Sequence, residues 1–132
     1  MMKKRKANEY FHVYILASNQ HDRLLKIGKT NNLRRTKHLA LMGYAGRSDW
    51  THVASFPVQS SQDALALESM IIAKLTNQGQ REPRMPWINL INERLSYADE
   101  CFTCSVDHAI SVALEMSEVV QAHLKGNHIA QP

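Results

Sequence analysis

The chain has 132 residues, of which 44% are hydrophobic and 21% are charged, and it carries a formal net charge of +4. A chain of this length can bury about two-thirds of its unfolded surface in one core, so it needs no disulfide or metal to fold. Its two cysteines are too few for a disulfide framework. No secretory-type apolar run follows the basic N-terminus, and no stretch approaches the roughly 18 apolar residues of a membrane span. This composition predicts a soluble, cytoplasmic, single-domain protein.

The charge is distributed unevenly along the chain. Residues 1–47 hold eleven Lys and Arg against two acidic residues, a net charge of +9, whereas the remainder holds five basic and ten acidic residues. A basic half of this kind is what a phosphate backbone selects, because neutralising phosphates releases condensed counterions. A solvated lysine surface with an irregular basic terminus explains the same charge equally well.

The first half of the chain predicts a hairpin, a basic helix and a third strand. Apolar runs at residues 10–17 and 23–28 flank the polar loop "SNQHD" and predict two antiparallel strands. N-cap candidates at residues 30–32 introduce a helix that ends before the breaker Gly43. Residues 50–58 then read as the third strand.

The second half predicts two longer helices. Ser60 or Ser61 caps the segment "SSQDALALESMIIAKL", whose apolar residues recur at helical spacing. Residues 79–87, with two prolines, are predicted as a loop, and a short extended piece at residues 101–104 precedes a helix over about 105–124. The expected fold is α/β (α+β), a small three-stranded antiparallel sheet flanked by helices, over residues 10–124. Residues 1–9 are interpreted as a basic tail, and residues 125–132 as a second tail.

Glu68 interrupts the apolar stripe of the first of these long helices. It lies four residues after Ala64 and three before Ile71, both of which are expected in the core. A buried, unpaired carboxylate is costly. Glu68 must therefore reach water at the edge of the stripe, pair with a cation, or bind a metal.

Three residues of the hairpin also call for an explanation. Tyr14 shares a strand face with His12 and Leu16, and a half-buried core tyrosine is the ordinary outcome. Lys26 occupies the middle of the neighbouring strand, and an ammonium near Tyr14 would lower the pKa of the phenol. Gly28, between Lys26 and Lys29, is typical of backbone that lies against a negatively charged group.

These elements together resemble the GIY-YIG nuclease superfamily. The two tripeptides are "HVY" at residues 12–14 and "KIG" at residues 26–28, the latter typical of a subgroup with lysine in the second tripeptide. The segment "DALALESMI" resembles the family helix whose glutamate binds the metal. The resemblance covers residues 10–76. Thr36 stands where the family has its helix arginine, so Arg35 is the expected substitute, with Arg34 and Lys37 as other candidates.

The resemblance implies a metal-dependent endonuclease that hydrolyses phosphodiester bonds in DNA, most readily double-stranded DNA. Tyr14 would be the general base, helped by Lys26, and Glu68 would hold one Mg²⁺ or Mn²⁺. The residues that would bind phosphate are Gly28, Lys29, Arg34, Arg35 and Lys37.

Weaker patterns and a second function remain open. Cys101 and Cys104, followed by His108, offer three zinc ligands without an obvious fourth, and burial of the cysteines as small apolar residues is the simpler interpretation. Asn89 and Asn92 are candidates for the family's late asparagine. Without a cation at Thr36, the same fold could bind nucleic acid or a partner without cutting, and an unrelated α/β protein is a further alternative.

Overall fold

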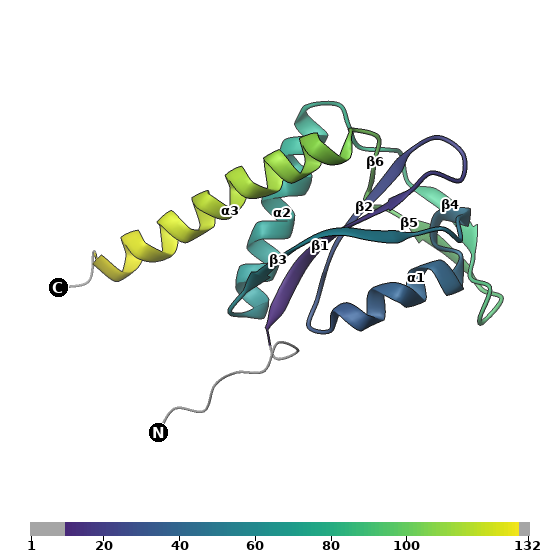
Figure 1. Ribbon diagram of the computed structural model, residues 1–132, viewed down its shortest axis with the longest axis horizontal. Coiled ribbons are helices and arrows are strands. Elements are labelled where there is room, and N and C mark those ends of the chain that lie inside the picture. The colour runs from purple at the N-terminus through teal and green to yellow at the C-terminus, as the bar shows by residue number, and fades with distance from the viewer. Residues whose placement is uncertain (1–9, 130–132) are drawn as a thin grey trace, which may run out of the picture.

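A computed structural model of the chain describes residues 10–129, with side chains described through residue 124 (Figure 1). The predicted hairpin is present: β1 (Phe11–Ser18) pairs antiparallel with β2 (Leu24–Thr30). In its register Tyr14 lies opposite Gly28, and Leu16 lies opposite Lys26. This pairing brings the two tripeptides side by side.

The central sheet has four strands, where the sequence predicted three. β3 (Thr51–Val58) pairs with β1, and the two-residue β6 (Cys101–Phe102) pairs with β2, giving the order β3-β1-β2-β6 with every pair antiparallel. The antiparallel α+β class is confirmed. The extra strand is the extended piece near Cys101, and it is too short to show an alternating pattern in the sequence.

A second sheet overlaps the end of the predicted loop at residues 79–87 and continues beyond it. β4 (Met85–Ile88) and β5 (Leu95–Ala98) form a separate antiparallel pair. The prediction of a loop over residues 79–87 is wrong at its end because Pro86 was taken as a breaker. A two-stranded ribbon has only edge strands, where proline is tolerated.

The helices follow their predicted starts. Asn32 caps η2 (Leu33–Thr36), a 3-10 turn that continues into α1 (Lys37–Met42), and the left-handed Gly43 ends α1. A second 3-10 turn, η3 (Tyr44–Gly46), follows directly. Ser60 caps α2 (Ser61–Asn77) by accepting a hydrogen bond from the amide of Asp63. α3 (Val106–Ile129) continues past residue 124, where the sequence predicted its end.

The sheet separates two apolar clusters. α2 and α3 cover one face, while α1 and the β4–β5 ribbon lie on the other (Figure 1). Val13, Ile15 and Ile27 pack with both long helices in the first cluster. Tyr14 and Leu16 belong to the second cluster, as the strand period predicted, with the residues Leu24, Tyr44, Trp50, Trp87, Ala98 and Cys101.

Within the part of the chain that the structure describes, no helix combines the length and apolar character that crossing a bilayer requires.

Candidate nucleic-acid interface

The Tyr14 side chain lies over Gly28 on the neighbouring strand. A Cβ added to Gly28 would stand 2.5 Å from Cζ of Tyr14, far inside van der Waals contact. The glycine is therefore required by the phenol. The space that the missing side chain leaves is filled by Tyr14, which is a second reason for a glycine here, and the role of Gly28 beside a phosphate stays a prediction.

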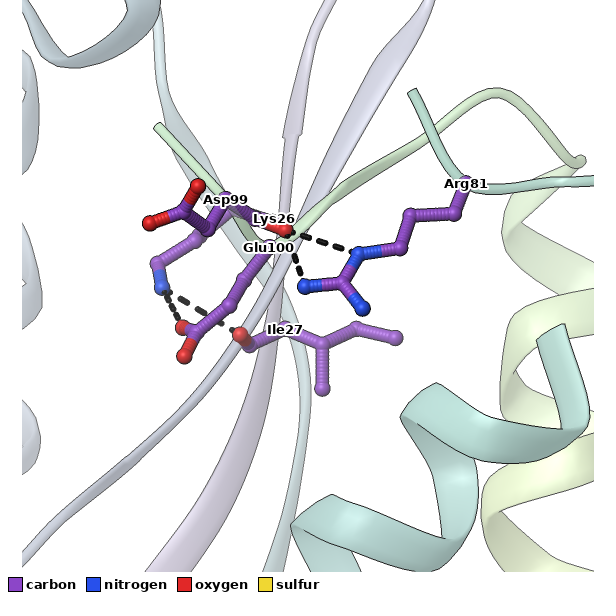
Figure 2. Close-up of polar contacts among 5 residues, drawn as sticks. All are labelled: Lys26, Ile27, Arg81, Asp99 and Glu100. Carbon is purple, nitrogen blue, oxygen red and sulfur yellow. Dashed lines mark hydrogen bonds and ion pairs between the residues drawn. The ribbon is translucent and has the colours of Figure 1, made fainter. Parts of the chain in front are cut away.

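Lys26 is held by an acidic residue that the sequence did not single out. Its ammonium contacts the Glu100 carboxylate and donates to the Ile27 carbonyl at 3.2 Å, as Figure 2 shows. The same ammonium stands 5.2 Å from the centre of the Tyr44 ring. The lysine side chain is only 9% exposed, so this pair compensates an otherwise costly buried charge.

Backbone contacts fix Glu100 beside β2. The amide of Ile27 donates to the carbonyl of Glu100 at 3.2 Å, and the Arg81 guanidinium donates two bonds to the Asp99 carbonyl at 2.9 and 2.6 Å (Figure 2). The position of the carboxylate therefore depends on the turn before β6. Sequence spacing offered no sign of it, because residues 26 and 100 meet only through tertiary structure.

Glu68 is buried on α2, with an exposed fraction of 7%. Among the described residues it accepts no hydrogen bond and forms no ion pair within salt-bridge distance. Burial first, and the Glu100 carboxylate second, raise its pKa, while the charges of Lys29 and Lys26 oppose that rise. No described residue forms a close ion pair with Glu68, and the two alternatives that remain are contact with water at the edge of the stripe and binding of a metal.

The pKa of Tyr14 is raised, whereas the sequence predicted that Lys26 would lower it. Burial is the main cause, followed by the carboxylates of Glu100 and Glu68. That prediction was wrong first because burial disfavours the phenolate, and second because Glu100 pairs with the Lys26 ammonium and adds a negative charge near the phenol. Tyr14, Glu68 and Glu100 thus form one electrostatically coupled group.

Two of the predicted phosphate-binding residues share a cleft of about 330 Å³. Lys29 and Arg35 both line it, together with Thr30 at the end of β2, Asn31 after it, Phe11 of β1, and Ser61 and Ala64 at the start of α2. Neither cation forms a salt bridge with a described residue. Ala64 lies one helical turn before Glu68, and the Lys29 charge acts on Glu68. Tyr14 and Glu68 do not themselves line this cleft.

Arg34 and Lys37 lie in a different place. They line a second cleft of about 510 Å³, between η2 and the start of β3. Thr36, at the position expected for an arginine, is buried and donates a hydrogen bond to the Leu33 carbonyl at 2.7 Å. The cations of this segment therefore face two clefts, one on each side of η2.

The other residues singled out from the sequence, the two cysteines, His108 and Asn89, make contacts within the domain. Cys101 and Cys104 are both free and buried, as expected, and burial raises the pKa of each thiol. His108 contacts the Gln78 side chain at 2.7 Å. Asn89 is buried and accepts hydrogen bonds from the amides of residues 91 and 92, so it orders the β4–β5 turn. Across the described residues, no group of three His, Cys, Asp or Glu side chains is placed to hold a metal.

Comparison with protein families identifies the domain. The model of the T5orf172 domain matches residues 11–117, which is most of the chain. The chain belongs to the T5orf172 domain family. This family is nuclease-associated and DNA-binding-like, in keeping with a general nucleic-acid-related role for the chain. Searches of the curated proteins and of the solved structures found no match.

The family match corrects the assignment made from the sequence. The T5orf172 model matches and no GIY-YIG model does, so the assignment to the GIY-YIG superfamily was wrong. The tripeptides at residues 12–14 and 26–28 carried that resemblance. In the structure these residues have local packing partners. The Tyr14 ring fits only against a glycine at residue 28, and the Lys26 ammonium is paired with the Glu100 carboxylate.

Proposed function

We propose that this T5orf172 domain binds double-stranded DNA through the cleft of Lys29 and Arg35 and hydrolyses a phosphodiester bond beside it. The observation that carries this proposal is the combination of two cations without close acidic partners in one cleft and a buried carboxylate, Glu68, within range of the Lys29 charge. Cations freed from protein carboxylates are available to phosphates. A carboxylate without hydrogen-bond donors is available to a metal.

Glu68 fits the role of ligand for one Mg²⁺ or Mn²⁺. The residue is largely buried, and its carboxylate accepts no hydrogen bond from the described residues. The nearby Glu100 carboxylate repels it, and a bound cation would reduce that repulsion. Mg²⁺ commonly takes one or two carboxylates and completes its shell with water and substrate phosphate, so a three-residue cluster is not needed. When bound, the metal supplies charge that stabilises the developing negative charge at phosphorus and the leaving oxygen.

Tyr14 is the proposed general base. Because its pKa is raised, the fraction of phenolate, which accepts the proton, increases toward alkaline pH. Gly28 fixes the position of the phenol, and burial, followed by the charges of Glu100 and Glu68, raises the pKa of Tyr14 above its usual value. Lys26 orients the Glu100 carboxylate and thereby sets the field at the phenol. In this scheme Lys26 is a positioning residue, whereas Lys29 and Arg35 orient the scissile phosphate.

Nicking of supercoiled plasmid in Mg²⁺ or Mn²⁺ tests the catalytic part of the proposal. Glu68→Gln should abolish nicking and keep the fold. The matched control is Glu115→Gln, because Glu115 is an exposed glutamate of α3 that makes only a long pair with Lys74 at 3.8 Å. Nicking by the Glu68→Gln variant, or equal loss in both variants, would overturn the assignment of Glu68.

The salt dependence of duplex affinity tests the binding part. Replacing Lys29 and Arg35 together by alanine should flatten the plot of log affinity against log salt by about one unit for each lost phosphate contact. Lys74→Ala with Arg84→Ala removes the same charge from exposed positions outside the cleft. An unchanged slope in the first pair, or an equal change in both pairs, contradicts the proposed cleft.

A second candidate function is binding without cleavage. It is favoured by the raised pKa of Tyr14 and by the buried, uncharged Thr36 at the position expected for an arginine. The two functions separate in one comparison. A domain that binds DNA with the predicted salt slope, yet fails to nick plasmid from neutral to alkaline pH with either metal, is a binding module.

A further inference from the structure

The second cleft lies on the opposite side of η2 from the proposed phosphate site. Its volume is about 510 Å³, within the range of small-molecule sites. Its apolar lining consists of Leu33 together with the small exposed parts of Leu16 and Trp50, which are 1% and 7% exposed, and Thr36 and Thr51 also line it. Arg34, Lys37 and His52 complete the lining, and all three are exposed.

The charges at the rim are free to meet a ligand. No described carboxylate forms a salt bridge with Arg34 or Lys37, so neither cation is neutralised within the domain. Residues adjacent in a 3-10 helix diverge by about 120° around its axis, which explains why Arg34 faces this cleft while Arg35 faces the other. A nucleic-acid strand that crosses η2 can therefore meet a cation on each side.

We infer that this cleft binds an unpaired nucleotide of the DNA strand, with its base on the Leu16, Leu33 and Trp50 floor and its phosphate at Arg34 and Lys37. The inference rests on the proposed DNA-binding function and narrows the substrate to duplex DNA that carries an unpaired segment. An apolar floor combined with cations at the rim is the arrangement that single-strand binding sites use. A fully paired duplex would first have to release a base from its stack, at the cost of its pairing and stacking.

Single-strand specificity requires both parts of the cleft. The cations alone would hold any phosphate, paired or unpaired, and would give affinity without preference. The apolar floor alone would favour an uncharged ligand. Their combination predicts that removal of one base from the ligand weakens binding even though every phosphate is kept.

The binding test compares fluorescein-labelled DNA ligands by anisotropy at fixed salt. The ligands are a blunt duplex, the same duplex with a short oligothymidylate extension, and that extended duplex with its thymine bases replaced by abasic sites. The extended duplex should bind roughly 5- to 100-fold more tightly than the abasic one, the range that stacking of a base covers. The blunt and abasic ligands should bind alike.

A variant that fills the cleft supplies the structural control. Thr51→Phe places a ring on an exposed strand position in the lining, where aromatic residues are tolerated. Thr103→Phe is its match, because Thr103 is also exposed and both hydroxyls donate to a backbone carbonyl at 3.3 Å. Thr51→Phe should remove the preference for the extended duplex and leave blunt-duplex affinity unchanged, whereas Thr103→Phe should alter neither.

Trp50 provides a second readout inside the cleft. In a Trp87→Phe variant Trp50 is the only tryptophan, and an oligothymidylate should quench its emission while an abasic oligonucleotide should not. If Trp87→Phe fails to fold, the anisotropy comparison still tests the inference, because it is made with the unmodified protein.

The outcomes separate this inference from the proposed function. Equal affinity for the extended and abasic ligands, with salt-dependent binding of both, overturns the nucleotide cleft and leaves DNA binding intact. Absence of binding to all three ligands overturns the proposed function itself, and the cleft with it. Equal loss of preference in Thr51→Phe and Thr103→Phe also overturns the cleft assignment.

Discussion

Gly28→Ala should displace the Tyr14 phenol without removing any functional group. The added Cβ would stand 2.5 Å from Cζ of Tyr14. Carbon atoms pack best at about 3.5–4.0 Å, so the ring must retreat by about 1 Å or more. Gly28 is buried in the middle of β2, with Tyr14 directly opposite on β1, so relaxation of the strand itself offers little relief.

The expected cost follows from two opposing contributions. Overpacking a filled site lowers the free energy of unfolding by about 1–3 kcal/mol. Replacing glycine by alanine restricts the unfolded chain and returns about 0.4–1 kcal/mol. The net loss should be about 1–2 kcal/mol, which corresponds to a decrease in Tm of roughly 5 °C for a domain of this size. Plasmid nicking should fall by about 100-fold, because a displacement of about 1 Å in a reacting group has that effect.

A double-mutant cycle isolates the contact between the two residues. Urea denaturation should be measured for the parent, Gly28→Ala, Tyr14→Leu and the double variant. Leucine lacks the ring atoms that the new Cβ would meet, so Gly28→Ala should cost little in the Tyr14→Leu background. An equal cost in both backgrounds, or a more stable Gly28→Ala in the parent, would refute the account of this glycine.

Three further predictions concern the charged group around Tyr14. Because the pKa of Glu68 is raised on folding, the folded chain binds more protons than the unfolded chain between the two pKa values, so stability falls as pH rises through this range. Urea denaturation across pH should show this fall in the parent and a smaller one in Glu68→Gln, and parallel curves would contradict it. If Tyr14 is the base, the nicking rate at saturating metal should rise nearly tenfold per pH unit from pH 7 to 9, since the raised pKa keeps the phenolate scarce. A flat profile with full activity would exclude Tyr14 as the base. Finally, Glu100→Gln should lower the free energy of unfolding by about 1–3 kcal/mol, because Lys26 loses its charged partner, whereas Glu115→Gln should cost under about 0.5 kcal/mol at its exposed pair. Equal losses in these two variants would show that the Lys26–Glu100 pair stabilises the fold no more than an exposed pair does.

Most of the fold follows from local sequence. The hairpin is fixed by two apolar runs around a polar loop, and α2 by its serine cap and apolar stripe. These features depend on residues close together in the chain, where patterns are informative. The β4–β5 ribbon escaped prediction because β4 contains Pro86, and β6 was predicted only as an extended piece because it has two residues. Their pairing depends on partners elsewhere in the chain.

The candidate site was less predictable because its electrostatics come from distant residues. Sequence reasoning found Glu68 from the interrupted stripe, and burial of this residue agrees with that reasoning. It placed Lys26 beside Tyr14 but did not weigh the burial of the phenol and had no means of finding Glu100, so it gave the wrong direction for the pKa of Tyr14. It named Arg34 as another candidate for the role of Arg35, although the two arginines line different clefts.

The shortness of β6 has a consequence for how the protein behaves at high concentration. On β2, only Leu25 and Lys26 pair with β6, so the outer edge of β2 from Gly28 to Thr30 has no neighbouring strand within the described residues. An open edge invites a strand from another molecule, and an exposed lysine is a common safeguard against such self-association. Lys29 is exposed on this edge, so its role in keeping molecules apart is separate from any contact with phosphate. Light scattering of Lys29 variants should therefore precede any interpretation of their lost activity.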